Sequence, residues 1–321
     1  MTRVAVVDLG TNSTRLLVAE PRGKGSLHQL AYAVTITRLG EGVDATRRLT
    51  NQAMERVRTC AHGYLTTARE LGACKSVAVA TSAVRDATNG PKFLERLGGE
   101  FGIATRLLSG REEALLTFHG ARMGRGFRES TLVVDVGGGS TELTVGTDAA
   151  VDFQASIEVG SVRLTERCLR SDPRLPEEVA AAGAVIRGAL VGTDLPAARP
   201  QRAVGVAGTL TTLAAIDLRV DADDTMAVEG HRLSLSRVES EVDRLAATSA
   251  AELRTLRGLH PDRAPVIAAG ALCVQEVLRF AGLDEIEVSV QDLLHGAALE
   301  LCTGEGGSAR TPRLRSPRDP A

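Results

Sequence analysis

The sequence predicts an α/β protein that has two similarly built domains and a cleft between them. Short runs of β-prone apolar residues alternate with amphipathic stretches of helical period along most of the chain. A turn of the form Asp-x-Gly, followed by hydroxyl residues, occurs twice, starting at Asp8 and again at Asp135. A length of 321 residues with 43% hydrophobic residues is enough for two globular cores.

The second turn is the more distinctive of the two. It joins strand-like runs at 131–136 and 142–146, and it contains Gly137, Gly138, Gly139 and Ser140. Consecutive glycines allow backbone N–H groups to converge on one point, which suits a phosphate oxygen. Asp135 and Glu142 flank the turn with the hard oxygen ligands that Mg²⁺ accepts. A plain hairpin is the alternative, although such a turn rarely needs three glycines between two carboxylates.

The first turn repeats this pattern. Residues 8–18 match residues 135–145 without a gap, and strand-like runs at 3–9 and 13–20 flank the turn. The turn itself contains Thr11, Asn12 and Ser13, and Ser13 pairs with Ser140. This identity predicts a duplicated unit. Two such turns that face each other would line a cleft with phosphate-binding backbone from both sides.

The rest of the first half alternates helices and strands. We expect a third strand at 28–39 and a glycine-containing loop at 38–43. Further strands are expected at 76–80 and 105–108, and helices at 50–71, 91–99 and 110–122. The strand at 76–80 should run parallel to the first strand, because a helix precedes it. It leads into Ser82 and Arg85 at the sheet edge where open α/β sheets bind ligands. The alternative is that Ser82 caps a helix and Arg85 lies on the surface.

Two glutamates, Glu112 and Glu113, stand in the first turn of the helix at 110–122. Acidic residues in this position usually complement the helix dipole and do nothing more. This helix, however, follows a strand that ends at the same sheet edge, which makes one of the two a candidate for the site.

The second half repeats the plan after a boundary at 124–130. Its later strands are expected at 151–158, 203–207 and 286–290. Its helices are expected at 160–166, 176–191, 236–248, 263–280 and 292–302. Gly208 and Thr209 follow a strand and are either a further phosphate-binding segment or a helix N-cap. We therefore predict domains at 1–124 and 125–302. A disordered tail is predicted at 303–321, where Gly, Ser, Pro and Arg show no apolar period.

Composition excludes several classes of protein. The net charge of −2 gives no general attraction to nucleic acid or membranes, and two tyrosines, six phenylalanines and no tryptophan leave few platforms for base stacking. The five scattered cysteines form no C-x-x-C pair, and no apolar run approaches the ~20 residues of a membrane span. We expect a cytoplasmic protein that binds neither nucleic acid nor membrane.

Known phosphate motifs other than these turns are absent from the sequence. Lys24 is followed by glycine where a Walker A loop needs a hydroxyl, and Glu142 stands where a dinucleotide fingerprint needs its third glycine. A nucleophilic Asp8 would need an acid at Gly10, so that role is disfavoured. There is no H-E-x-x-H motif, which argues against zinc.

The duplicated turns resemble the two phosphate loops of the actin/sugar kinase/heat-shock ATPase superfamily, which implies two ribonuclease H-like domains with a phosphate-binding cleft between them. Within it, the chain is more similar to the short, two-domain form of the exopolyphosphatase/guanosine pentaphosphate phosphohydrolase (Ppx/GppA) family. The similarity covers roughly residues 3–300 through six co-linear motifs, at 8–16, 38–43, 80–85, 109–114, 134–143 and 207–209. Two positions depart from the family pattern, Pro265 and His295, and both are expected to lie away from the glycine loops.

The resemblance implies that water hydrolyses a terminal phosphoanhydride. Glu113 falls on the general base, and Arg85 would neutralise charge in the transition state. Mg²⁺, or Mn²⁺ in its place, would be held by Asp135 and Glu142, with Asp8 nearby. Phosphate would contact the two turns together with Ser82, Gly208 and Thr209. The implied substrate is inorganic polyphosphate, with guanosine pentaphosphate as the runner-up, and the implied assembly is a homodimer. A phosphate or nucleotide sensor and an ATP-dependent kinase are the alternatives from other classes.

Overall fold

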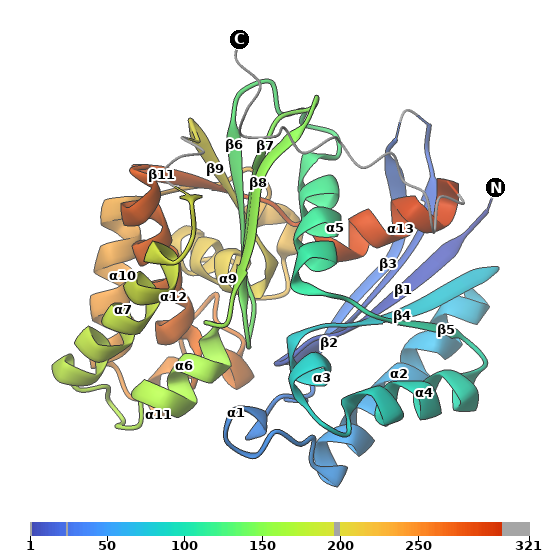
Figure 1. The fold of residues 1–321 in the computed structure, drawn as a ribbon, viewed down its shortest axis with the longest axis horizontal. Coiled ribbons are helices and arrows are strands. Elements are labelled where there is room, and N and C mark those ends of the chain that lie inside the picture. The colour runs from blue at the N-terminus through green and yellow to red at the C-terminus, as the bar shows by residue number, and fades with distance from the viewer. Residues whose placement is uncertain (1, 24, 196–199, 304–321) are drawn as a thin grey trace.

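The computed structural model describes residues 2–23, 25–195 and 200–303. It contains two mixed sheets flanked by helices, with the first half of the chain to the right and most of the second half to the left in Figure 1. The α/β class predicted from the sequence is confirmed. The predicted tail lies outside the described residues, apart from Thr303, which ends the last helix. None of the described helices is both long and apolar enough to cross a bilayer.

The first sheet has the strand order β3-β2-β1-β4-β5. Its strands are β1 (Val4–Leu9), β2 (Ser13–Pro21), β3 (Leu27–Ile36), β4 (Lys75–Ala80) and β5 (Ala104–Leu107). β1 is antiparallel to β2 and parallel to β4, as the intervening helix predicts. The helices of this half are α1 (Val43–Thr46), α2 (Asn51–Glu70), α3 (Ser82–Asp86), α4 (Gly90–Phe101) and α5 (Gly110–Arg122). The short helix α1 was not expected, because its four residues follow a glycine loop and are too few to show a helical period.

The second sheet has the order β10-β11-β9-β6-β7-β8. Its strands are β6 (Thr131–Val136), β7 (Thr141–Gly146), β8 (Val151–Ile157), β9 (Arg202–Val206), β10 (Arg232–Ser234) and β11 (Glu285–Val288). β6 is antiparallel to β7 and parallel to β9. The order β8-β7-β6-β9-β11 therefore repeats that of the first sheet, so the predicted duplication extends to the whole sheet. β10 is an addition at the edge that the sequence analysis missed.

The helices of the second half differ from the expectation at three places. They are α6 (Ser161–Cys168), α7 (Pro176–Val191), α9 (Ala207–Leu218), α10 (Leu235–Ala247), α11 (Ala250–Leu253), α12 (Ile267–Ala281) and α13 (Leu293–Thr303). No element was expected at the short helix α11. The segment after β9 is a full helix, α9, so Gly208 and Thr209 lie in its first turn. α12 begins at Ile267 rather than at residue 263, and Pro265 precedes it instead of lying in its first turn.

Two helices each pack against the sheet of the other half of the chain. Helix α5 belongs to the first half by sequence, yet its Phe118 packs in one core with Val133 and Val204 of the second sheet. Helix α13 ends the described chain, yet Leu294 packs in a core with Val6 of the first sheet. The two helices meet between the sheets (Figure 1). A Cβ at Gly296 would overlap backbone of α5, and one at Gly120 would overlap the backbone of Asp292, just before α13, so glycine permits this close crossing.

Candidate active site

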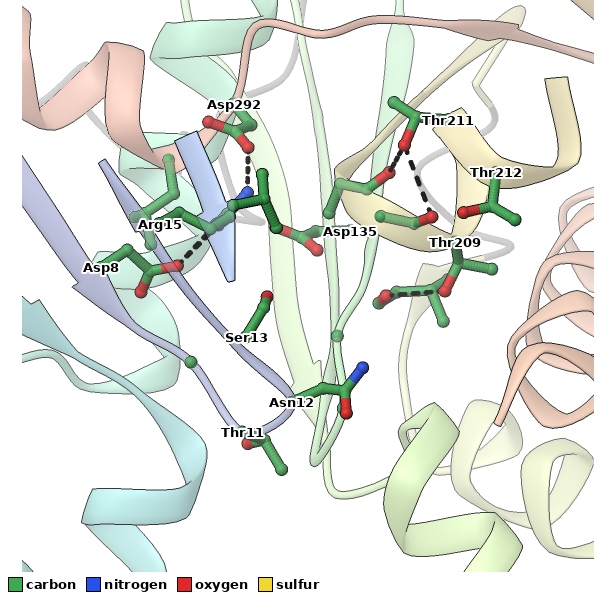
Figure 2. Close-up of a pocket in the computed structure, with 18 of the residues that line it drawn as sticks. Asp8, Thr11, Asn12, Ser13, Arg15, Asp135, Thr209, Thr211, Thr212 and Asp292 are labelled. Atoms are coloured by element: carbon green, nitrogen blue, oxygen red, sulfur yellow. Dashed lines mark hydrogen bonds and ion pairs between the residues drawn. The ribbon is translucent and has the colours of Figure 1, made fainter. Parts of the chain in front are cut away.

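A cavity of about 470 Å³ lies between the two halves and is lined from both of them. The β1–β2 turn and the β6–β7 turn approach each other at this cavity, and the start of α9 forms another part of the wall (Figure 2). The predicted site residues that line the cavity are Asp8, Thr11, Asn12, Ser13, Ser82, Glu113, Asp135, Gly137, Gly138, Gly139, Ser140, Gly208 and Thr209. Neither Arg85 nor Glu142 is among the described residues that line it.

In the first turn, the backbone carbonyls are bound by the chain segment that follows β3. The Thr37 and Arg38 N–H groups donate to the Asn12 carbonyl at 3.1 and 2.9 Å, and the Gly40 N–H donates to Thr11 at 2.8 Å. Because the C=O and N–H of a trans peptide point in opposite directions, the N–H edges of these peptides are directed away from that segment. They are available to an anion in the cavity.

The second turn is held in the same way by helix α6. The Ser161 N–H donates to the Gly137 carbonyl at 2.9 Å, and the Val162 N–H donates to the Gly138 carbonyl at 2.8 Å. The Arg163 side chain supplies the third bond, from Nε to the Gly139 carbonyl at 2.7 Å. Both turns thus have their carbonyls occupied on one side, which leaves N–H groups for a phosphoryl group on the other.

Two of the glycines in the second turn serve close packing. A Cβ on Gly138 would lie 2.9 Å from the Thr11 Cβ, and one on Gly139 would overlap the Ser82 hydroxyl. Gly137, Gly138 and Gly139 are not among the residues with positive φ. Glycine is therefore required here because the two halves approach each other through this turn, and not because of an unusual backbone conformation.

Helix α9 begins at the cavity with a strained residue. Ala207 has a φ of 64°, in the left-handed region that disfavours any side chain. The turn directs the N-terminus of this 12-residue helix at the cavity, where a helix dipole favours an anion. The Thr209 hydroxyl donates to the Val136 carbonyl at 3.2 Å, so in this structure its oxygen bonds to protein (Figure 2).

The structure distinguishes the two adjacent glutamates at the start of α5. Glu112 accepts from the Ser109 N–H at 2.9 Å and from its hydroxyl at 2.8 Å, which completes a capping box. Glu113 instead is 7% exposed and accepts from Arg85 Nη1 at 3.2 Å. Burial, together with the charges of Glu142 and Asp135, raises the pKa of Glu113 well above its usual range. Glu112 therefore caps the helix, whereas Glu113 is buried and lines the cavity.

Three more buried carboxylates lie behind or beside the turns. Asp135 and Glu142 are paired residues of β6 and β7, and burial is the main reason that the pKa of each is raised. Burial also raises the pKa of Asp8, because it outweighs the charge of Arg15. One oxygen each of Asp8 and Glu142 is buried without a hydrogen-bond partner in the described chain. Such orphaned oxygens fit ligands of a cation.

The described side chains do not form a complete metal cage. No group of three or more His, Cys, Asp or Glu residues in residues 2–23, 25–195 and 200–303 is arranged to hold a metal ion.

Sequence reasoning missed a buried ionic chain at one end of the cavity. Arg15 donates from Nε to Asp8 at 2.8 Å and also pairs with Asp292 (Figure 2). Burial alone would raise the pKa of Asp292, but the Arg15 charge and a hydrogen bond from His295 lower it to about 2. His295, expected to lie away from the site, is thus linked to it through Asp292. An arginine next to the apolar run at 16–19 of strand β2, paired in register with Asp8, was the available signal.

Arg263 is a second residue that the sequence reasoning missed. It lines the cavity, and its guanidinium occupies the space that a Cβ on Gly208 would fill. Burial lowers its pKa to about 10, and no hydrogen bond or ion pair joins its guanidinium to another described residue. A cation without an anion at the wall of a cavity is suited to a phosphate group that enters it.

The family comparison agrees with the geometry of the cavity. The sequence profile of the Ppx/GppA phosphatase family matches residues 3–303. Among curated proteins, the chain is 39% identical to exopolyphosphatase 2 of Mycobacterium tuberculosis, covering 94% of this chain and 99% of that protein. It is 30% identical to exopolyphosphatase 1 of Mycobacterium bovis, over 94% of this chain and 89% of the relative.

Solved structures show the same relationship. A crystal structure of an exopolyphosphatase-like protein has a TM-score of 0.88 and 31% identity, covering 94% of this chain and 99% of the other. The Ppx/GppA protein of Aquifex aeolicus has a TM-score of 0.77 and 30% identity, covering 96% of this chain and 99% of the other. Taken with the two matching Asp-x-Gly turns and the buried glutamate that lines the same cavity, these similarities show that the chain belongs to the Ppx/GppA phosphatase family and is a homologue of exopolyphosphatases.

Proposed function

We propose that this protein is an exopolyphosphatase that removes the terminal phosphate of inorganic polyphosphate. One observation carries the proposal: the buried carboxylate of Glu113 lines the same cavity as two turns whose carbonyls are bound elsewhere. The turns supply N–H donors for a phosphoryl group, and the carboxylate is the only described glutamate that lines this cavity. Phosphoryl transfer depends mainly on such positioning and electrostatic stabilisation.

In the proposed reaction, a water molecule attacks the terminal phosphorus, and Glu113 accepts its proton. The P–O bond to the next phosphate breaks, which releases orthophosphate and a chain shorter by one unit. Arg85, bonded to Glu113, orients the carboxylate and offsets negative charge that develops nearby. The raised pKa of Glu113 makes it a stronger base than a free carboxylate once it is ionised.

Mg²⁺, or Mn²⁺, is the proposed cofactor. Asp135 and Glu142, with the free oxygen of Asp8, would hold it directly or through water. When bound, the cation neutralises phosphate charge and favours the ionised form of the surrounding carboxylates.

Guanosine pentaphosphate is the second candidate substrate. The cavity wall on β3 includes Ala33, Val34 and Ile36, and the Val34 side chain is 41% exposed. This apolar wall gives a nucleobase a surface to pack against, whereas a polyphosphate chain would gain nothing from it. The chemistry at Glu113 would be unchanged.

Phosphate release from the purified protein with Mg²⁺ tests these proposals. Tripolyphosphate, long-chain polyphosphate, guanosine pentaphosphate and ATP are compared, with EDTA as the control for metal dependence. The Glu113→Gln variant should still bind substrate but lose about 10²- to 10⁴-fold in turnover, because it cannot accept the proton. Retained turnover would remove Glu113 from the role of base. Preference for guanosine pentaphosphate would select the second candidate, and no release from any substrate would favour a sensor.

A further inference from the structure

The two halves meet at two places of different chemistry. Helices α5 and α13 pack together through apolar side chains and glycine, in the upper half of Figure 1. At the lower edge of the view, α6 of the second half faces α1 and α3 of the first half. That contact is made largely by charged side chains. When a buried ion pair separates into water, hydration of the two charges offsets much of the lost attraction, whereas apolar surfaces that separate lose their full burial.

Arg163 lies at the centre of this charged contact and is 6% exposed. Its Nη1 donates to Asp44 of α1 at 2.6 Å, and its Nη2 pairs with Asp86 of α3. Within its own half, Nη2 also donates to Glu158 at 3.0 Å. We call Arg163, Asp44 and Asp86 the interdomain clasp. It crosses from one half of the chain to the other through a single side chain.

Two neighbouring contacts strengthen the clasp. Arg167, one turn further along α6, donates to the same Asp44 carboxylate from Nε at 2.5 Å. The Gly42 N–H, just before α1, donates to Glu166 at 3.0 Å. All these bonds join α6 to the segment around α1, so they form or break together when the halves close or separate.

The same arginine also holds the second phosphate turn. Its Nε donates to the Gly139 carbonyl at 2.7 Å, opposite the N–H of Ser140. Gly138 and Gly139 also pack against Thr11 and Ser82 of the other half. The packing of this turn against the first half requires the two halves to be in contact. The interdomain clasp forms in that same closed state.

We infer that Arg163, through Asp44 and Asp86, couples closure of the cleft to the arrangement of the second phosphate turn. None of the three is among the described residues that line the cavity, so they are positioning residues. The inference rests on the proposed function for its kinetic consequence but not for its structural one. If the clasp is weakened, a smaller fraction of molecules is closed. The apparent affinity for phosphate then falls in proportion to the closed fraction.

The test compares the double variant Asp44→Asn/Asp86→Asn with wild type and with Asp217→Asn. Asp217 is a matched control, because it pairs with Arg237 at 2.6 Å entirely within the second half. Binding of tripolyphosphate is measured by calorimetry in EDTA, and the radius of gyration by X-ray scattering at equal molecular mass. Neither readout needs turnover, so a failure of the hydrolase proposal leaves this test intact.

The double variant should bind tripolyphosphate about tenfold more weakly, as expected for a closed fraction of about one tenth. It should also have a larger radius of gyration without ligand, while Asp217→Asn matches wild type in both. Wild-type affinity and an unchanged radius of gyration in a folded double variant would overturn the inference that the clasp holds the cleft closed.

A second variant tests the link to the phosphate turn. Arg163→Lys keeps a positive charge for Asp44 and Asp86 but lacks the fork that reaches the Gly139 carbonyl. If the protein hydrolyses polyphosphate, this variant should lose kcat as well as affinity, whereas the double variant should mainly raise KM. A kcat equal to that of wild type in Arg163→Lys would overturn the coupling.

Discussion

Arg15 and Arg263 show how differently two arginines can be held in one cavity. Arg15 bonds to Asp8 and Asp292, so its charge is balanced within the protein. Arg263 has no such partner among the described residues, and burial lowers its pKa to about 10. A folded-state pKa below the unfolded value means that the charged form is less favourable in the folded protein, so the buried charge of Arg263 lowers stability.

Arg263→Gln should therefore weaken substrate binding without destabilising the fold. A charged hydrogen bond to phosphate contributes about 1.5–3 kcal/mol, so KM for tripolyphosphate should rise about tenfold or more. The free energy of unfolding should stay constant or increase, because an unbalanced charge has been removed. Steady-state kinetics and urea unfolding measure the two effects.

Arg279→Gln serves as the control with the opposite pattern. Arg279 bonds to Glu239 at 2.8 Å and to the buried Glu276 at 3.1 Å on α10 and α12, away from the cavity. Its loss should lower stability and leave KM unchanged. An Arg263→Gln variant with wild-type KM would exclude Arg263 from phosphate binding.

In helix α5, the N-terminal capping box lies next to Glu113, the proposed catalytic residue. Its capping box, formed by Ser109 and Glu112, fixes the first turn, and Glu113 projects from that turn toward the cavity. A loosened first turn would shift the Glu113 carboxylate, and small displacements of a catalytic group are costly in rate. Helix α11 carries an equivalent capping box, formed by Ser249 and Glu252, far from the proposed chemistry.

Ser109→Ala and Ser249→Ala should accordingly have similar effects on stability but different effects on activity. Loss of an N-cap costs about 1 kcal/mol. Both variants should therefore unfold at lower temperature, as followed by circular dichroism, while only Ser109→Ala should reduce kcat. Equal kcat values in the two variants would show that the cap does not position Glu113.

For the molecule as a whole, the exchange of α5 and α13 makes the two halves depend on each other. Leu294 of α13 is fully buried in a core that includes Leu116 of α5 and Val6 of the first sheet. The residues before α13 in the chain belong to the second sheet. Unfolding of either half should therefore expose apolar core residues of the other half to water, which favours one cooperative transition.

Leu294→Ala should lower the free energy of unfolding by about 2–5 kcal/mol, because it leaves a cavity in this shared core. Circular dichroism and tyrosine fluorescence, which reports on Tyr32 and Tyr64 of the first half, should follow the same urea transition in the variant. Val191→Ala, at a side chain 71% exposed on α7, should change it little. Two separated transitions would contradict the mutual dependence of the halves.

The sequence alone determined the α/β class, the two Asp-x-Gly turns and most strands and helices. These features reside in local patterns: apolar periodicity, glycine spacing and hydroxyls that follow strands. The site residues from those turns are brought to one cavity because both turns lie at the ends of equivalent strands. Residues 43–46, 232–234 and 250–253 were missed because elements of three or four residues are too short to show a period.

Only the tertiary structure decided which arginines are buried and what they contact. Arg15 meets a carboxylate 277 positions away, and Arg163 meets partners 119 and 77 positions away. An arginine in a sequence has the same chemistry whether it is solvated or enclosed, and burial depends on the elements that pack over it. The capping role of Glu112 follows from the local pattern Ser109-x-x-Glu112, whereas the burial of Glu113 beside Asp135 and Glu142 appears only when the helix packs against the second sheet.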